Sequence, residues 1–455
     1  MRRTMLALLT CLLVAAGCSS ERSPSASSPN TEADAPDTSF GDLDSPCGDG
    51  DASGATDVGV TDAEIRIGYG DDAGFAALPG GGHEMSDAVH ALIGWCNEQG
   101  GIDGRTIVGT YYDAKVTEIN NAVLQACEDD VFMLVGEGWA LDSAQEQTRL
   151  GCALPAFPTY AVSPQFANAP LMVAAQPNPV DRQPVGLARW YADTHPAKAK
   201  KVGTVAINFA ASIDTREKQK STWPKVGMGF IGGCDVELQL LGEADYKPFA
   251  KRLQDCGAEV VSFIATPHPV FENFLEAADQ LGYHPDYLAE GNFYDQQFAR
   301  WNVRDLARTT YVRIADVPLE HAAENEATAD YVRIVRADGG DVSGLGIHAA
   351  SAFLLWATAV DACADALTRE CVLAEAATIH DWDGGGLAGP ADSGGNLPST
   401  CEVVVRLDGT RWVQVFPEEP GTLHCDQENV QAVTGQVVDK VRLGPDRRVH
   451  EFEPE

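Results

Sequence analysis

The stretch IRIGYGDDAGFAALPGGGHEMSDAVHALIGWCNEQGGIDGRTIVGTYY, residues 65–112, passes through three hydrophobic patterns in succession. Its first residues, IRIGY, predict a short strand, and a loop rich in glycine and proline follows to residue 82. The apolar residues of VHALIGWC (89–96) then recur at the spacing of one helix face, and the glycine run at 100–104 ends that helix. Residues 106–112 alternate as a second strand. This order predicts a βαβ unit on a parallel sheet.

The same rhythm continues along the chain. A helix is predicted around residues 118–129, and the run VFMLVG at 131–136 has the composition of a buried strand. Further strands are predicted at 202–207 and 260–265. In open parallel sheets, ligands bind beyond the carboxyl ends of the strands. The corresponding loops here are 69–82, 137–143, 160–165, 266–270 and 290–295.

Length and composition limit the possible classes of protein. The chain has 455 residues, 44% of them hydrophobic, which is enough for two or three domains with sizeable cores. Its 32 lysines and arginines face 67 aspartates and glutamates, so the formal net charge is −35. A surface of that sign repels phosphate backbones and anionic lipid headgroups. We therefore expect no binding to nucleic acid.

The N-terminus has the pattern of an export signal. Arg2 and Arg3 precede an apolar run, residues 5–16, that is too short to span a bilayer. The following Gly17-Cys18 resembles a bacterial lipobox, although Ala15 stands where leucine is usual. We predict a signal peptide at 1–17, acylation of Cys18 and anchoring to the outer face of the cell membrane. The alternative is an ordinary cleaved signal with an incidental cysteine.

The segment that follows the signal differs in composition from the rest of the chain. Residues 18–59 consist mainly of Ser, Pro, Asp, Ala and Gly and hold almost no large apolar side chains. Such a segment cannot bury enough surface to offset its conformational entropy. We therefore predict a lipidated flexible tether at 18–59.

Ten cysteines remain once Cys11 has left with the signal and Cys18 carries a lipid. An even set in an exported protein indicates disulfides. Pairing them in order along the chain gives Cys47–Cys96, Cys127–Cys152, Cys234–Cys256, Cys363–Cys371 and Cys401–Cys425. An unbroken helix would hold Cys363 and Cys371 about 12 Å apart, so this pair requires a turn within residues 368–370. No Cys/His cluster has zinc-ligand spacing, so we expect no metal and no other cofactor.

Motifs of the common enzyme classes are missing from the sequence. There is no G-x-S-x-G elbow, no P-loop, no H-E-x-x-H and no G-x-G-x-x-G after a strand. Pairs of acidic residues carry no signal for a glycosidase in a chain with 67 of them. We therefore expect a protein that is not an enzyme.

Six segments follow one another in an order typical of a known family. They are GVTDAEIRIGYG (59–70), WCNEQGGIDGRTIVGTYYDA (95–114), VFMLVGEGWALDS (131–143), FPTYAVSPQF (157–166), VVSFIATPHPVFENFLEAADQLGYHPDYLAEGNFYD (260–295) and GIHAASAFLLWATAVDACADAL (346–367). Together they resemble the extracytoplasmic solute-binding proteins of ABC importers, specifically the branched-chain amino-acid-binding, or type 1 periplasmic, family. The turn N-x-x-G-G-I-x-G-R at 97–105 is the most specific motif, and the resemblance runs from about residue 60 to about residue 416.

The resemblance implies an α/β fold of two doubly wound, Rossmann-like lobes joined by a three-segment hinge. By analogy, lobe 1 comprises residues 60–177 and 315–395, lobe 2 comprises 178–314 and 396–425, and 426–455 form a C-terminal extension. The implied function is capture of a small polar solute, an amino acid or a related compound, by a monomeric receptor. Hinge closure around the solute would let the closed form dock on an ABC permease. The alternative is a ligand-sensing or interaction lipoprotein of the same fold that is not coupled to transport.

The resemblance also implies where lobe 1 holds the solute. Members of the family bind the solute carboxylate with backbone N–H groups and hydroxyls of two loops, which correspond here to residues 138–140 and 161–163. The candidates for ligand binding in these loops are Gly138, Trp139, Ala140, Ala161 and Ser163. The usual serine-rich stretch is replaced by Trp139-Ala140-Leu141, so backbone donors remain but side-chain donors are lost. Trp139 could stack on a solute or serve only for packing.

On lobe 2 the resemblance assigns an acidic residue to the solute ammonium group. Glu290, in LAEGNFYD, occupies that position and could form a charge-assisted hydrogen bond with a cation. Thr266 and His268 stand where the family has further aromatic and polar contacts. The alternatives are an exposed loop glutamate and a surface histidine.

Overall fold

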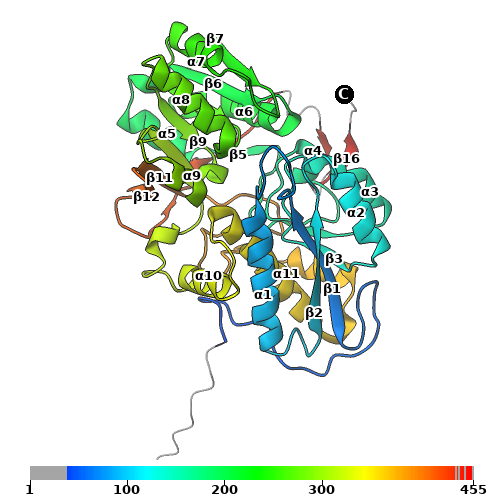
Figure 1. The fold of residues 1–455 in the computed structure, drawn as a ribbon. Coiled ribbons are helices and arrows are strands. Elements are labelled where there is room, and N and C mark those ends of the chain that lie inside the picture. Colours follow the sequence, from blue (N-terminus) through cyan, green and yellow to red (C-terminus); the bar gives the residue numbers. More distant parts are fainter. Residues whose placement is uncertain (1–37, 436–437, 439–440, 445–446, 453–455) are drawn as a thin grey trace, which may run out of the picture. The chain divides into compact units, whose positions relative to one another are not determined.

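The computed structural model describes residues 38–435, 438, 441–444 and 447–452, and these residues form two main sheets with helices packed on them (Figure 1). The predicted signal peptide at 1–17, Cys18 and the first part of the predicted tether lie outside the described residues. We call the first sheet with its helices lobe 1 and the second sheet with its helices lobe 2.

Lobe 1 is built on a parallel sheet of four strands. Their order is β2 (Thr106–Asp113), β1 (Glu64–Asp71), β3 (Met133–Val135) and β4 (Ala156–Phe157). One face packs on α1 (His83–Glu98), α10 (Glu326–Ala337) and α11 (Gly344–Asp361), and the other packs on α2 (Ile119–Glu128). Successive residues of a strand point to opposite faces, so Val135 joins the first core and Leu134 the second. Helix α11 is long and apolar enough to span a bilayer, but 78% of it is buried within the protein.

Lobe 2 is built on a larger mixed sheet. Its order is β12 (Arg411–Phe416), β11 (Cys401–Asp408), β10 (Thr310–Ile314), β9 (Asp286–Ala289), β8 (Val260–Ile264), β6 (Val202–Ile207) and β7 (Phe230–Leu238). Strands β6 to β10 are parallel to one another, and β11 and β12 add antiparallel to the edge. The main helices of this lobe are α5 (Gly186–Thr194), α6 (Ala210–Thr222), α7 (Lys247–Asp255) and α8 (Glu272–Gln280). The predicted two-lobed α/β architecture is therefore present.

The smaller elements complete the description. They are α3 (Glu146–Gly151), α4 (Pro164–Ala167), α9 (Gln296–Trp301), α12 (Arg369–Ala376), β5 (Arg182–Pro184), β13 (His424–Cys425), β14 (Val430–Ala432), β15 (Val441–Leu443) and β16 (Val449–Phe452). The chain passes between the lobes after β4, after β10 and before β11. Strand β14 pairs with β5, and β15 pairs with β16.

The turn at 97–105 shows why its motif is specific. The Asn97 side chain donates to the Ile107 carbonyl at 2.9 Å and accepts from the Ile107 N–H at 2.8 Å, which joins the end of α1 to β2. Gly101 has φ 85°, and a Cβ there would lie 2.0 Å from the Arg105 carbonyl oxygen. Arg105 is itself buried and donates to the Thr61 carbonyl at 3.0 Å. The turn therefore needs a side chain that both donates and accepts at 97, a residue without Cβ at 101, and a buried hydrogen-bond donor at 105.

Residues 38–59 are not a flexible tether, and this part of the prediction is wrong. Phe40 is fully buried and packs edge-on against Trp95, with ring centroids 5.9 Å apart. The Gly48 N–H donates to the Gly101 carbonyl at 2.7 Å, and Ser45 Oγ donates to Gln99 Oε1 at 2.8 Å. Phe40, the partly buried Leu43 and these hydrogen bonds hold the segment on lobe 1 despite its polar composition. We call residues 38–59 the N-terminal arm.

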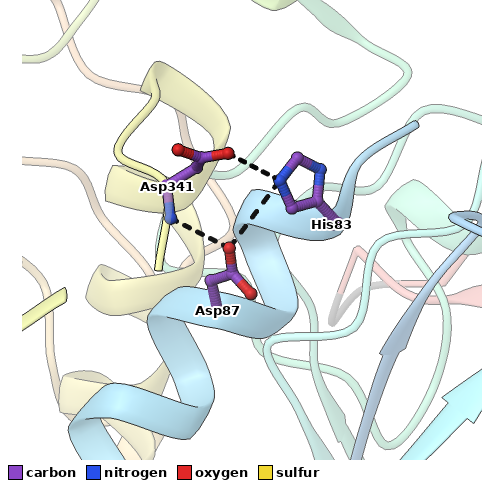
Figure 2. Close-up of side chains that lie close together, drawn as sticks. All are labelled: His83, Asp87 and Asp341. Atoms are coloured by element: carbon purple, nitrogen blue, oxygen red, sulfur yellow. Dashed lines mark hydrogen bonds and ion pairs between the residues drawn. The ribbon is translucent and has the colours of Figure 1, made fainter. Parts of the chain in front are cut away.

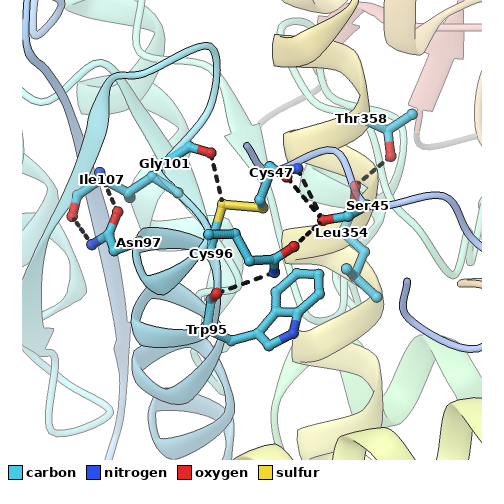
Figure 3. The surroundings of a disulfide bond; sticks show 10 residues. Ser45, Cys47, Trp95, Cys96, Asn97, Gly101, Ile107, Leu354 and Thr358 are labelled. Atoms are coloured by element: carbon cyan, nitrogen blue, oxygen red, sulfur yellow. Dashed lines mark hydrogen bonds between the residues drawn. A yellow bond between two sulfur atoms is a disulfide. The ribbon is translucent and has the colours of Figure 1, made fainter. Parts of the chain in front are cut away.

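Five disulfides occur among the described residues, and they join the pairs expected in order along the sequence. Figure 3 shows the pair Cys47–Cys96, which ties the N-terminal arm to the end of α1. The Cα atoms of Cys363 and Cys371 lie 6.1 Å apart. The required turn precedes the expected one, because α11 ends at Asp361 and α12 begins at Arg369 with Thr368 as its cap.

Candidate functional site

A cavity of about 450 Å³ lies between the two lobes. Its size falls in the range of about 300–1,000 Å³ that small-molecule pockets have. All five loops predicted from the carboxyl ends of strands contribute to its walls. Sequence reasoning missed the loops that follow β6 and β7 and the segments that cross between the lobes, which also line it. The cavity is the candidate binding site.

The lobe 1 wall contains three of the five residues predicted there. Gly138, Ala140 and Ala161 line the cavity, whereas Trp139 and Ser163 lie outside its lining. Trp139 is 1% exposed and belongs to the lobe 1 core. The Ser163 hydroxyl accepts from the Phe166 N–H at 3.2 Å and caps α4. Packing and helix capping therefore account for these two residues.

Two carboxylates of the chain itself occupy the backbone donors expected to hold a solute carboxylate. Asp72 accepts from the Ala140 N–H at 2.7 Å and from the Val116 N–H at 2.6 Å. Asp142 accepts from the Val162 N–H at 2.7 Å and from the Ser163 N–H at 3.1 Å. Burial raises the pKa of both aspartates to about 6, against the effect of these hydrogen bonds. Each loop thus already contains an anion where the resemblance implies a solute anion.

Glu290 lines the cavity but faces partners on its own lobe. Its Oε2 accepts from Arg313 Nε at 3.1 Å, and its Oε1 accepts from Gln219 Nε2 at 3.0 Å. Lys218 lies nearby and donates to the Asn178 side chain and to a crossing-segment carbonyl, both at 3.0 Å. Burial lowers the pKa of Lys218 to about 8, although the Glu290 charge opposes the shift. The Glu290 carboxylate therefore has a cationic partner before any solute arrives.

Thr266 and His268 also line the cavity. Thr266 Oγ1 donates to the His268 carbonyl at 2.8 Å, so its hydroxyl holds the loop. The His268 ring lies 2.6 Å from a Glu272 oxygen and 2.9 Å from an Asp295 oxygen. Burial disfavours the charged ring, but the hydrogen bonds to Asp295 and Glu272 outweigh it and raise the pKa of His268 to about 9. A protonated histidine between two carboxylates is the result.

Several lining residues were not singled out from the sequence. Asp72, Glu84 and Tyr160 line the lobe 1 wall, and Arg313 lines the wall of lobe 2. Asp72 directly follows β1, so the rule that ligands bind beyond strand ends could have found it. Arg313 lies within the strand β10, and no local pattern distinguishes it from a surface arginine.

A cluster of His83, Asp87 and Asp341 lies at the start of α1 and has ligand atoms close enough to hold a metal ion (Figure 2). His83 Nε2 lies 3.0 Å from Asp341 Oδ2 and 3.8 Å from Asp87 Oδ2. Burial disfavours the charged ring, but the hydrogen bond to Asp341 raises the pKa of His83 to about 9. The protonated imidazole forms ion pairs with these carboxylates. The cluster therefore joins α1 to the segment between α10 and α11.

From the pKa values of several buried carboxyl groups and of two histidines, we predict that the protein is more stable in mild acid than in mild base. Burial raises the pKa of Glu84 and Glu402 to about 7 and that of Glu137 to about 8. The folded state thus binds more protons than the unfolded state between about pH 4.5 and 8, and this stabilisation is lost as the pH rises. His83 and His268 act in the same direction between about pH 6.5 and 9.

We expect the free energy of unfolding to be lower at pH 8 than at pH 5.5 by on the order of 3 kcal/mol. Urea unfolding at both values and constant ionic strength measures it. Equal or greater stability at pH 8 would contradict the proposed protonation states.

Comparison with known proteins gives the family. A family model described as periplasmic binding protein matches residues 64–411. No curated protein sequence matches the chain significantly. The fatty acid ABC transporter substrate-binding protein from Thermomonospora curvata is similar in structure, with a TM-score of 0.63, 17% identity, and coverage of 82% of this chain and 95% of that chain.

Two further solved structures share the fold. The ABC transporter solute-binding protein from R. palustris in complex with 4-hydroxybenzoate has a TM-score of 0.65 and 14% identity, and the match covers 80% of this chain and 98% of that chain. The branched-chain amino acid transporter substrate-binding protein LivJ from Streptococcus pneumoniae, in complex with isoleucine, has a TM-score of 0.61 and 14% identity, with 77% and 99% covered. The predicted type 1 periplasmic binding fold is confirmed.

The family match covers most of the chain, and both lobes of the fold lie within it. The expectation that the protein is not an enzyme agrees with this match, because the family consists of binding proteins. The chain therefore belongs to the periplasmic binding protein family.

Proposed function

We propose that the protein is an extracytoplasmic receptor that captures a small organic solute between its lobes and delivers it to an ABC importer. The observation that carries the proposal is the cavity, because its walls come from both lobes of a periplasmic binding protein. The solved structures named above are described as ABC transporter binding proteins, which supports coupling to transport. Five disulfides support a location outside the cytoplasm. Anchoring through Cys18 completes the proposal.

Capture by hinge closure requires a solute that contacts both lobes. A ligand shifts a conformational equilibrium only by the difference between its affinities for the two states. We propose that Gly138, Ala140 and Ala161 contact the solute from lobe 1, and that Thr266, His268 and Glu290 contact it from lobe 2. These six residues line the same cavity from opposite sides.

An amino acid is the solute that the sequence resemblance favours, and the occupied donors weigh against it. Binding an α-carboxylate at the Ala140 or Val162 N–H would require displacement of Asp72 or Asp142. The names of similar structures mention isoleucine, 4-hydroxybenzoate and fatty acid, so the fold accepts chemically different solutes. The residues that line this cavity, rather than the family, therefore determine which class of solute the protein binds.

Thermal unfolding of the mature chain against a library of small metabolites tests the proposal. A solute present at 100 times its Kd should add about 2.7 kcal/mol to the free energy of unfolding. The same solute should have a smaller effect on a variant with a blocked cavity, such as Ala140→Trp. If no library member stabilises the protein, capture of a small solute is contradicted.

A further inference from the structure

The cavity has mainly apolar walls on both sides. Phe75, Leu78 and Met85 line it from lobe 1. Phe209 and Leu241 line it from lobe 2, and Leu241 is 69% exposed. A large apolar side chain at the rim of a cavity loses its contact with water when a ligand covers it. These walls fit a solute with an apolar body.

The charged groups of the lobe 2 wall already have partners. Arg313 and Glu290 face one another, and His268 lies between Glu272 and Asp295. A solute ammonium at Glu290 would have to compete with the guanidinium of Arg313. A solute carboxylate at Arg313 would likewise compete with Glu290. A solute therefore contacts the lobe 2 wall mainly through its apolar side chains, because no charged group described there is unpaired.

The lobe 1 wall keeps two polar groups without strong partners, the Glu84 carboxyl group and the Tyr160 hydroxyl. The Tyr160 hydroxyl has no hydrogen-bond partner among the described residues. Glu84 is buried, and its closest cation is His83, whose Nδ1 lies 3.5 Å from Glu84 Oε2. Asp72 adds a second carboxylate to the same wall. Charges interact strongly in such a desolvated site, so a negative solute group is repelled and a hydrogen-bond donor is favoured.

We propose that the solute is a predominantly apolar molecule without a negative charge, whose polar end donates a hydrogen bond to Glu84 or Tyr160 on lobe 1. Its apolar body lies against Phe209 and Leu241 of lobe 2. This inference rests on the proposed function and gives the chemical class of the solute. This arrangement differs from that of the amino-acid binders, in which lobe 1 holds the negatively charged carboxylate of the solute.

Two fluorescent dyes with one skeleton test the proposal on the mature chain. N-phenylnaphthylamine is uncharged and has one N–H donor, and anilinonaphthalene sulfonate is the same molecule with an added sulfonate. We expect the uncharged dye to bind with enhanced fluorescence and the sulfonate to bind at least tenfold more weakly. Equal or tighter binding of the sulfonate would overturn the charge assignment. Absence of binding by the uncharged dye would overturn the apolar assignment.

Substitutions locate the dye and identify the acidic group. Leu241→Glu should abolish binding of the uncharged dye, whereas Val303→Glu, at a 76% exposed position of lobe 2 outside the cavity, should not. Glu84→Gln should reduce the preference for the uncharged dye by at least threefold. Glu98→Gln is the control, because Glu98 is exposed on the same helix and about 21 Å further along it. An unchanged preference in Glu84→Gln would overturn the role of Glu84.

The dye and the metabolite screen separate the two proposals. If the uncharged dye does not bind and an amino acid stabilises the protein, this inference is wrong and the proposed function stands. If neither the dye nor any metabolite binds, both are wrong.

Discussion

Replacement of Cys47 and Cys96 by serine is expected to lower the free energy of unfolding by about 4 kcal/mol. The disulfide joins residues 49 positions apart. In the chain-entropy model, a crosslink that closes a loop of this length removes much of the freedom of the unfolded chain. The pair also holds the N-terminal arm against the end of α1, where the Gly48 N–H meets the Gly101 carbonyl.

Urea unfolding of the double variant measures the loss. Limited digestion with an aspartate-specific protease reports on the arm, because residues 38–59 contain five aspartates and no lysine or arginine. We expect cleavage in the arm to become faster than cleavage elsewhere in the folded protein. The pair Cys363→Ser with Cys371→Ser is the control, because it closes only 8 residues and should cost about 2.5 kcal/mol. Losses in the opposite order would show that loop length does not determine the effect.

The arm also shows what sequence reasoning could and could not predict. Five strands and two helices were predictable, because their apolar residues recur with the period of a strand or a helix or form a short buried run. The arm lacks such a period, and its composition resembles that of a linker. Yet the predicted pair Cys47–Cys96 already required residue 47 to lie beside the end of α1. Composition and covalent pairing disagreed for this segment, and the covalent pairing was the stronger constraint.

The cavity was predictable as a place but not as a chemical environment. The rule that ligands bind beyond strand ends found five of its loops without any knowledge of contacts. Whether a loop N–H is free depends on a partner distant in the chain, since Asp72 reaches Ala140 across 68 positions. The same holds for Glu290, whose partner Arg313 is 23 positions away. No local pattern carries this information.

Replacement of Arg313 by methionine is expected to lower the free energy of unfolding by about 3 kcal/mol. The Arg313–Glu290 pair is largely buried, with 21% and 25% of its side chains exposed. Glu402 is fully buried nearby, and burial raises its pKa to about 7 although the Arg313 charge opposes the shift. Methionine keeps most of the packing of the arginine side chain but removes the guanidinium charge that faces Glu290 and Glu402. Removal of one partner from a buried pair costs more than the pair contributes, because the remaining charge stays desolvated.

The loss should depend on pH and on Glu290. Without Arg313 the pKa of Glu402 rises further, so the deficit is smaller at pH 5.5, where the folded carboxyl keeps its proton, than at pH 8. Addition of Glu290→Gln should recover part of the stability, because one of the two carboxylates is removed. Arg304→Met is the control, since Arg304 forms an ion pair with Glu276 that is 57% and 42% exposed and should cost less than about 1 kcal/mol. Urea unfolding of the three variants and the wild type at both pH values measures these differences. Equal losses for Arg313→Met and Arg304→Met would show that the buried pair contributes no more to stability than an exposed pair.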